Sequence, residues 1–310
     1  MLKAPRYGII LEISMLILEI IKAIVFGIVE GITEWLPVSS TGHIILLDEF
    51  LSLNVGGNLG VEFASEYREM FEVVIQLGAI MAVLVTFISK LNPFGKNKSQ
   101  VEKKATYSLW WKIIIASVPA AIIGIVGDKI LEIATGKDID GWIFNVWVVS
   151  AMLIVYGILF IVVEKLLRGK SERVSSLDSI TTRDALLIGV FQTLAIVPGT
   201  SRSGATILGA RMLGISRTVA AEFSFFLGIP AMLGASALKT LGFLSFVSEN
   251  NISVPTDAWI VLLVAALVAF LVSLVCIKFL VDFVKKHTFI PFGVYRIILG
   301  AILIIYFLVR

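Results

Sequence analysis

The sequence predicts an all-α, polytopic membrane protein, and three observations support this fold class. Of the 310 residues, 58% are hydrophobic and 16% are charged, against about 45–50% and about 25% in ordinary globular domains. The mean hydropathy is +0.96. Several apolar stretches also have the length of about 20 residues that a helix needs to cross a bilayer. This composition excludes a soluble enzyme, a disordered chain and a nucleic-acid-binding domain.

Six apolar stretches are the expected transmembrane helices. In chain order they cover residues 71–89, 109–127, 142–163, 218–238, 258–281 and 289–309. Arg296 lies near the end of the last stretch, so we expect its charged group to extend toward the membrane surface.

Two further apolar stretches, residues 12–50 and 184–215, are interrupted by polar residues. Pro-Val-Ser-Ser-Thr-Gly stands at 37–42 in the first, and Pro-Gly-Thr-Ser-Arg-Ser-Gly stands at 198–204 in the second. Proline removes a backbone donor and glycine weakens a helix, so we expect each helix to break there. Broken backbone at membrane depth is tolerated only where it is buried in protein or lines a wet cavity. We therefore interpret both stretches as re-entrant helical hairpins.

The charges of the connecting segments predict how the chain is oriented. The basic segments are 90–112, 164–184 and 282–287, and the acidic segments are 48–70, 128–140 and 242–257. The positive-inside rule predicts that the lysine-rich loops are on the cytoplasmic side of the plasma membrane. The six spans alternate correctly only if each interrupted stretch returns to the side on which it started, which favours the re-entrant interpretation.

The two interrupted stretches resemble each other. Gly-Ile-Val-Glu at 27–30 precedes the first interruption, and Gly-Val-Phe-Gln at 189–192 precedes the second. The single transmembrane domain, residues 1–310, is predicted to contain repeat 1, about residues 12–163, and repeat 2, about residues 184–310. Each repeat has one hairpin and an odd number of spans, so the second is expected to be inverted, with the site where the broken helices meet. The alternative is that any two apolar segments rich in glycine and proline look alike.

The ionisable residues of the interrupted stretches are candidates for catalysis, because charges are rare in membrane segments and are usually functional there. Glu30 and Glu34 are four residues apart, so they share one helical face and could hold a divalent cation. Ser40 and His43 have the residue types of a nucleophile and its general base. Arg202 offers a planar fork that matches phosphate oxygens. Together these groups indicate phosphoryl chemistry on an anionic substrate.

Hydroxyl groups and free backbone N–H groups near a helix start add neutral donors for phosphate oxygens. The candidate substrate-binding residues of this kind are Ser39, Thr41, Gly199, Ser201, Ser203 and Thr206. Each candidate also has a structural alternative. The serines and threonine at 39–41 could cap a helix, a glutamate could be a structural partner of Arg202, His43 could be an interior histidine, and Arg202 could be an interfacial charge.

The motifs resemble the signatures of a known family, the undecaprenyl-diphosphate phosphatases of the bacitracin-resistance type. Glu-Gly-Ile-Thr-Glu-Trp-Leu-Pro-Val-Ser-Ser-Thr-Gly-His at 30–43 is similar to the first signature, and Pro-Gly-Thr-Ser-Arg-Ser-Gly-Ala-Thr at 198–206 to the second. Phe-Glu-Val-Val-Ile-Gln-Leu-Gly at 71–78 also resembles the family. The resemblance runs from about Ile24 to the C-terminus.

The resemblance implies an integral membrane enzyme that removes the terminal phosphate from a polyprenyl diphosphate lipid carrier, with Mg²⁺ or Ca²⁺ as cofactor. Membrane lipids are then its other contacts, and no nucleic acid partner is expected. The product monophosphate would return to peptidoglycan and other cell-envelope synthesis, and the activity would confer bacitracin resistance. The resemblance also implies inverted repeats with two re-entrant regions.

Matched by motif, Glu30 and Glu34 correspond to the essential acidic pair, Ser40 and His43 to the serine–histidine pair, and Arg202 to the phosphate-binding arginine. Our preferred hypothesis has Ser40 as nucleophile, His43 as its general base and the glutamates as metal ligands. Two alternatives stay open: His43 is the nucleophile, or a glutamate activates water directly.

A different class of function also fits the architecture. Inverted repeats with broken helices that meet near the midplane describe many secondary transporters, so the main alternative is a lipid-phosphate flippase or an anion transporter. A carrier needs charge complementarity but no nucleophile and no proton shuttle, so Ser40 and His43 favour the enzyme.

Overall fold

The computed structural model describes residues 4–56, 59–95, 98–136, 142–143 and 145–310, with the backbone only at 4–12. Within these ranges the regular elements are helices, and the one pairing of β type is an isolated bridge between Val174 and Ile215. The elements are α1 (Ala4–Thr33), α2 (Ser40–Leu51), α3 (Val61–Thr86), α4 (Ile88–Leu91), α5 (Gln100–Ala121), the π-helix η2 (Ile122–Gly127), α6 (Asp128–Thr135), α8 (Val146–Leu166), α9 (Thr182–Thr193), the 3₁₀ turn η3 (Leu194–Ile196), α10 (Arg202–Met212), α11 (Arg217–Glu249), α12 (Thr256–Lys286) and α13 (Ile290–Val309).

Six helical segments in the described part of the chain are long and apolar enough to cross a membrane. They cover Val61–Thr86, Gln100–Thr135, Val146–Leu166, Arg217–Glu249, Thr256–Lys286 and Ile290–Val309. Each overlaps one of the six predicted spans, so the all-α class and the multi-pass membrane architecture are confirmed.

Several helices extend well beyond the predicted apolar spans. α3 begins at Val61, so the acidic segment 48–70 is partly helical, and α5 begins at Gln100 inside the basic segment 90–112. Glutamate and lysine are good helix formers, so a helix continues past the lipid-facing stretch that hydropathy detects. Ser99 and Glu102 form a capping box that fixes the start of α5.

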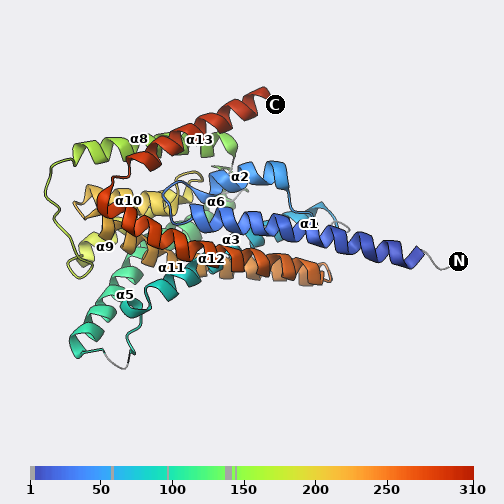
Figure 1. Ribbon diagram of the computed structural model, residues 1–310, viewed down its shortest axis with the longest axis horizontal. Helices are drawn as coiled ribbons and strands as arrows, with labels where there is room; N and C mark the ends of the chain where they lie inside the picture. The colour runs from blue at the N-terminus through green and yellow to red at the C-terminus, as the bar shows by residue number, and fades with distance from the viewer. Residues whose placement is uncertain (1–3, 57–58, 96–97, 137–141, 144) are drawn as a thin grey trace.

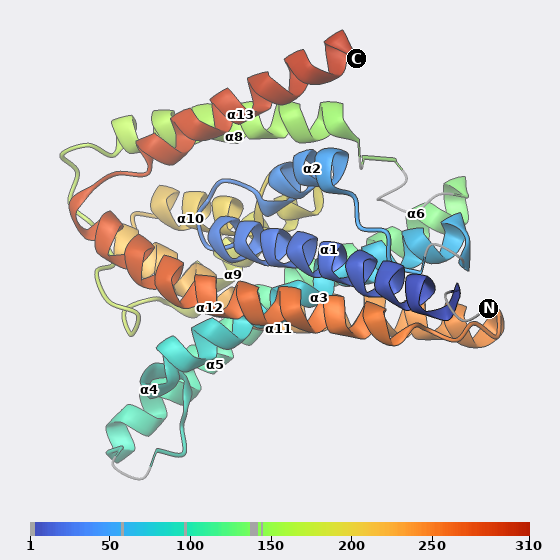
Figure 2. The same ribbon diagram turned by 45° about the vertical axis from the view of Figure 1, so that its right-hand side comes forward.

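The helices pack as a layer and a separate pair with shorter helices between them (Figures 1 and 2). α12 packs against α1 and α3, and α3 packs against α11, whereas α8 pairs with α13. The short helices α2 and α10 lie between this pair and the layer, and each contacts α8. The two helices that follow the sequence interruptions therefore lie between longer helices.

One surface of α12 shows how the bundle meets its surroundings. Leu263, Leu267, Leu271 and Val275 follow one another every four residues, and each is more than half exposed. Residues at this spacing form one stripe along a helix. A long, exposed apolar stripe on a helix of this length is suited to contact with lipid rather than with water.

Candidate active site

The first break covers residues 34–39, between α1 and α2. Pro37 lacks a backbone N–H and restricts the residue before it, so α1 cannot continue through it. Trp35 is fully buried and packs edge-on against Phe225 of α11, with ring centroids 5.3 Å apart. Ser39 adopts a left-handed conformation with φ of 73°, and α2 begins at the next residue. The first break is thus a buried, well-packed turn.

The second break covers residues 194–201, between α9 and α10. The chain makes the single 3₁₀ turn η3 and then passes through Pro198 and Gly199, with φ of 87° at the glycine. Ser201 is left-handed, with φ of 70°, and α10 begins at Arg202. Both predicted interruptions are therefore real breaks, and each ends on a left-handed serine directly before a helix.

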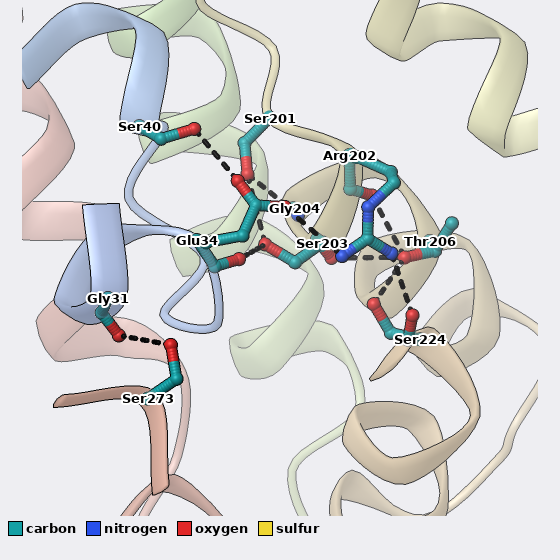
Figure 3. A network of polar contacts seen from close by, with 10 residues as sticks. All are labelled: Gly31, Glu34, Ser40, Ser201, Arg202, Ser203, Gly204, Thr206, Ser224 and Ser273. Atoms are coloured by element: carbon teal, nitrogen blue, oxygen red, sulfur yellow. Dashed lines mark hydrogen bonds and ion pairs between the residues drawn. The ribbon is translucent and has the colours of Figure 1, made fainter. Parts of the chain in front are cut away.

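Glu34 joins the two breaks (Figure 3). Its Oε2 accepts a hydrogen bond from Ser40 Oγ at 2.9 Å, and its Oε1 pairs with Arg202 Nη2 at 3.3 Å. Its backbone carbonyl accepts a hydrogen bond from Ser203 Oγ at 3.2 Å. One carboxylate thus contacts the candidate nucleophile from the first stretch and the candidate phosphate-binding arginine from the second.

The Arg202 guanidinium is held on several sides. Nη1 donates to the backbone carbonyl of Ser224 at 2.7 Å, and the guanidinium lies 5.9 Å from the centre of the Trp35 ring. A Cβ added at Gly228 would come within 2.8 Å of Nη2, so α11 leaves room for the guanidinium only because this residue is glycine. These contacts fix the fork and leave Nε without a hydrogen-bond partner in the described part of the chain.

The hydroxyl groups of the second signature have different partners. Ser201 Oγ accepts a hydrogen bond from the backbone N–H of Gly204 at 3.1 Å, so it caps α10. It also lies 3.1 Å from Ser203 Oγ. Thr206 Oγ1 donates to the carbonyl of Arg202 and lies 2.7 Å from Ser224 Oγ. These hydroxyls therefore support the start of α10, on which Arg202 stands.

Glu30 lies one helical turn before Glu34, as predicted, and is buried. Its Oε1 has no hydrogen-bond partner among the described residues. Within those residues no group of three or more histidine, cysteine, aspartate or glutamate side chains could hold a metal ion. A cation at this glutamate pair would therefore need further oxygen ligands from a substrate or from water.

His43 lies beside the first break rather than against Ser40. Its Nδ1 is 2.7 Å from the backbone carbonyl of Ser39, and its Nε2 is 2.6 Å from the hydroxyl of Tyr295, whose ring is parallel to the imidazole. A carbonyl only accepts, so in the neutral imidazole Nδ1 carries the hydrogen and Nε2 accepts from the tyrosine. The structure thus brings Ser40 to Glu34, and His43 to Ser39 and Tyr295.

A cavity of about 480 Å³ lies where the two breaks meet. Six of the predicted site residues line it: Glu34, Ser40, Thr41, Gly199, Ser201 and Arg202. Its other walls are mostly apolar and come from the end of α5, from η2 and from Pro230–Leu238 of α11. The remaining predicted site residues lie outside the lining: Glu30, Ser39, His43, Ser203 and Thr206.

Some residues of the site were not singled out from the sequence. Gln76 and Gln192 line the cavity, and the Oε1 atom of Gln192 has no partner in the described part of the chain. The signal for Gln192 was present, because it ends the Gly-Val-Phe-Gln segment that resembles the Gly-Ile-Val-Glu segment ending at Glu30. The expectation for Arg296 was wrong: this side chain is fully buried rather than extended toward the membrane surface, because the broken helices supply backbone carbonyls that bind it.

Comparisons with known proteins identify the family of this chain. Residues 23–302 match the family described as bacitracin resistance protein BacA. A protein of Enterococcus faecalis named undecaprenyl-diphosphatase is 50% identical over 294 residues, which cover 95% of this chain and 99% of the relative. Undecaprenyl-diphosphatase 1 of Clostridioides difficile is 51% identical, with 94% and 97% covered. The family match covers both breaks and five of the six candidate spans and ends within the sixth, and the chain belongs to the bacitracin resistance protein BacA family.

Proposed function

We propose that this protein is an integral membrane phosphatase that hydrolyses polyprenyl diphosphate, with undecaprenyl diphosphate as the natural substrate, to the monophosphate and inorganic phosphate. The names of its relatives support this substrate. The observation that carries the proposal is that Ser40 and Arg202, from different breaks, contact the same carboxylate of Glu34 and line one cavity. A nucleophile and a phosphate-binding fork beside each other are what phosphoryl transfer requires.

The cavity suits an amphiphilic substrate. Its lining combines the polar side chains of Glu34, Ser40 and Arg202 with apolar residues such as Ile125 of η2 and Leu238 of α11. The diphosphate would bind to the polar groups, and the first isoprene units would contact the apolar residues. Product monophosphate would return to cell-envelope synthesis, and its regeneration would confer bacitracin resistance.

In the proposed reaction, Ser40 Oγ attacks the terminal phosphorus while its proton passes to a base. The bond from this phosphorus to the bridging oxygen breaks, and polyprenyl monophosphate leaves. Water then hydrolyses the phosphoserine, which releases inorganic phosphate and restores the hydroxyl. Arg202 binds the phosphate oxygens and stabilises the charge that develops on them.

The identity of the base separates our hypotheses. The hydrogen bond from Ser40 to Glu34 supports Glu34 as the group that takes the proton. His43 as base requires its ring to leave Tyr295 and turn toward Ser40, because both ring nitrogens have other partners. Attack by His43, or by water that a glutamate activates, is the remaining alternative.

A divalent cation fits the residues of this site. The Glu30 and Glu34 carboxylates stand one turn apart, and a buried oxygen of Glu30 has no partner in the described residues. Mg²⁺ is commonly held by one or two carboxylates together with substrate phosphates. We propose Glu30 and Glu34 as ligands of Mg²⁺ or Ca²⁺, which would neutralise charge on the diphosphate. Ser39, Thr41, Gly199, Ser201, Ser203 and Thr206 remain proposed as substrate-binding residues or as their support.

We further propose that the two broken stretches are re-entrant hairpins within inverted repeats. Each break divides two helices and ends on a left-handed serine, which supports repeat 1 at about 12–163 and repeat 2 at about 184–310 of one domain. We place the basic segments 90–112, 164–184 and 282–287 on the cytoplasmic side of the plasma membrane.

The experiment is phosphate release from undecaprenyl diphosphate by purified protein in detergent, with Mg²⁺, with Ca²⁺ and with EDTA. A Ser40→Ala variant tests the nucleophile, and Ser176→Ala, at an exposed serine outside this cavity, is the matched control. We expect cation-dependent release that falls by about 10³-fold in Ser40→Ala and stays unchanged in the control. Near-normal turnover by Ser40→Ala would refute the serine mechanism. If folded protein released no phosphate but moved intact diphosphate across vesicles, the flippase would be correct.

A further inference from the structure

Arg296 of α13 is a buried cation that the proposed mechanism does not use. Its guanidinium is fully buried and donates to four backbone carbonyls. Nη1 donates to Pro37 at 3.2 Å, and Nη2 donates to Gly199 at 2.7 Å, Thr200 at 2.9 Å and Met152 at 3.5 Å.

Three of these four carbonyls belong to the breaks, since Pro37 lies in the first break and Gly199 and Thr200 lie in the second, whereas Met152 belongs to α8. Pro37 is two residues before the left-handed Ser39, and Thr200 directly precedes the left-handed Ser201. A helix break leaves backbone carbonyls without helical partners, and an unpaired carbonyl in an apolar interior is costly. The Arg296 side chain, from a third helix, therefore provides hydrogen-bond donors for backbone carbonyls of both breaks.

A second buried arginine shows that this arrangement is unusual. Arg211, at the end of α10, forms ion pairs with Glu164 at 3.1 Å and Glu172 at 3.3 Å. Arg296 has no carboxylate partner among the described residues. Burying a charge without a counter-charge costs free energy. Charge pairing within the bundle therefore does not explain why Arg296 is buried.

We propose that Arg296 is a positioning residue. Its planar fork fixes the position of one break relative to the other, so that Ser40 and Arg202 face the same cavity. Its distance from the reaction fits this role, because Arg296 does not line the cavity. Its hydrogen bonds reach the backbone just before Ser39 and Ser201, the residues that precede α2 and α10, and Ser40 and Arg202 are the first residues of those helices. The catalytic consequence rests on the proposed phosphatase function, whereas the structural link between the breaks does not.

The test uses full-length protein and compares Arg296→Lys, Arg296→Met and Arg211→Met with the unmodified chain. Lysine keeps the positive charge but loses the planar fork. Hydrogen–deuterium exchange followed by mass spectrometry reports the two breaks through peptides that cover residues 34–43 and 197–206. Steady-state phosphate release, normalised to folded protein, gives kcat and KM.

In Arg296→Lys we expect exchange to become about tenfold faster in both peptides, because local opening exposes amides. We expect kcat to fall about 100-fold, since small misplacements of reacting groups have effects of this size, while KM changes by less than about threefold because Arg202 is retained. Arg296→Met should show the same pattern more strongly. In Arg211→Met, exchange should rise near its own ion pairs but not at residues 34–43, with kcat within about threefold of the unmodified chain.

Three results would overturn the proposal. The first is unchanged exchange at residues 34–43 in Arg296→Lys. The second is a fall in the kcat of Arg296→Lys that is no larger than the fall in Arg211→Met at the same loss of stability. The third is failure of Arg296→Lys to fold, which would make Arg296 a folding residue. If the unmodified protein released no phosphate, the proposed function would fail, and the exchange data would still decide whether Arg296 links the breaks.

Discussion

The two breaks end in a similar backbone conformation, but the stretches that contain them contribute opposite charges to the site. Each ends on a serine in the left-handed region, with φ of 73° at Ser39 and 70° at Ser201, and a helix starts at the next residue. This conformation costs a residue other than glycine about 1–2 kcal/mol. Both strained turns persist because they are over-determined by their surroundings, and Arg296 contacts the chain just before each of them.

The side chains of the breaks differ where the chemistry requires it. The first stretch supplies the carboxylates Glu30 and Glu34, and the second supplies the guanidinium of Arg202. The hydroxyl of Ser201 caps α10, whereas the hydroxyl of Ser39 has no partner in the described residues. The comparison teaches that a similar turn in each stretch brings a cation and a carboxylate to one cavity. Equivalent serines cap a helix in one break and lack a partner within the described residues in the other.

The largest effect is expected from removing the positive charge of Arg202, the first residue after the second break. Arg202→Ala should lower kcat/KM for phosphate release by about 10³-fold, because a charged donor to the developing phosphate charge is lost. Arg202→Lys keeps the charge without the fork, so it should recover only part of this loss. The measurement is phosphate release from undecaprenyl diphosphate in detergent. An Arg202→Ala enzyme within tenfold of the unmodified one would show that the second break does not bind the reacting phosphate.

The carboxylates of the first break should give the next largest effect, and they should differ from each other. Glu34→Gln removes the charge that both Ser40 and Arg202 contact, so kcat should fall about 10²-fold even at saturating Mg²⁺. Glu30→Gln should instead raise the Mg²⁺ concentration needed for half-maximal rate by about tenfold, since it removes one proposed ligand. Equal cation requirements in the Glu30→Gln variant and the unmodified enzyme would remove Glu30 from the cation site.

The sequence predicted the features of this comparison that depend on neighbouring residues. Apolar length predicts the six spans, because the bilayer thickness sets the number of residues that a helix needs. Pro37 and Pro198 predict both breaks, because proline acts on the backbone beside it. The spacing of Glu30 and Glu34 predicts their shared helical face, because one turn of α1 joins them.

Contacts between distant segments could not be predicted in the same way. Arg296 is 259 residues from Pro37 in the chain, and Tyr295 is 252 residues from His43. An arginine near the end of an apolar stretch has the same sequence pattern whether it extends to the interface or satisfies buried carbonyls. Ser40 illustrates the same limit, because its sequence neighbour His43 is a plausible base, yet the packed helices direct its hydroxyl to Glu34.

Two glycines of α3 and α11 extend the comparison to the helices behind the breaks. A Cβ at Gly228 would come within 2.8 Å of Arg202 Nη2, the end of a side chain, whereas a Cβ at Gly78 would lie 1.9 Å from the backbone carbonyl oxygen of Ala266 in α12. Gly228→Ala should therefore lower kcat about tenfold by displacing the fork, with little loss of stability. Gly78→Ala should destabilise the fold by about 1–3 kcal/mol, because two helices must separate.

Thermal unfolding in detergent and phosphate release per folded molecule test both glycine variants. We expect Gly228→Ala to lose activity without losing stability, and Gly78→Ala to lose stability while each folded molecule stays active. If Gly228→Ala were as active as the unmodified enzyme, the close fit of α11 around Arg202 would have no role in catalysis.

The smallest expected effects separate the two left-handed serines. Ser201→Ala removes the hydrogen bond that caps α10, so it should destabilise the protein by about 1 kcal/mol. Ser39→Ala removes no hydrogen bond present in the described structure, and alanine has the same Cβ in the same strained conformation, so stability should change by less than about 0.5 kcal/mol.

If the free Ser39 hydroxyl binds a phosphate oxygen, its removal should raise KM about fivefold, the value of one neutral hydrogen bond. Unfolding and KM measured on the same two variants should therefore give opposite rankings. If stability and KM ranked the two variants in the same order, the two serines would have the same role, and the breaks would differ only in the charges beside them.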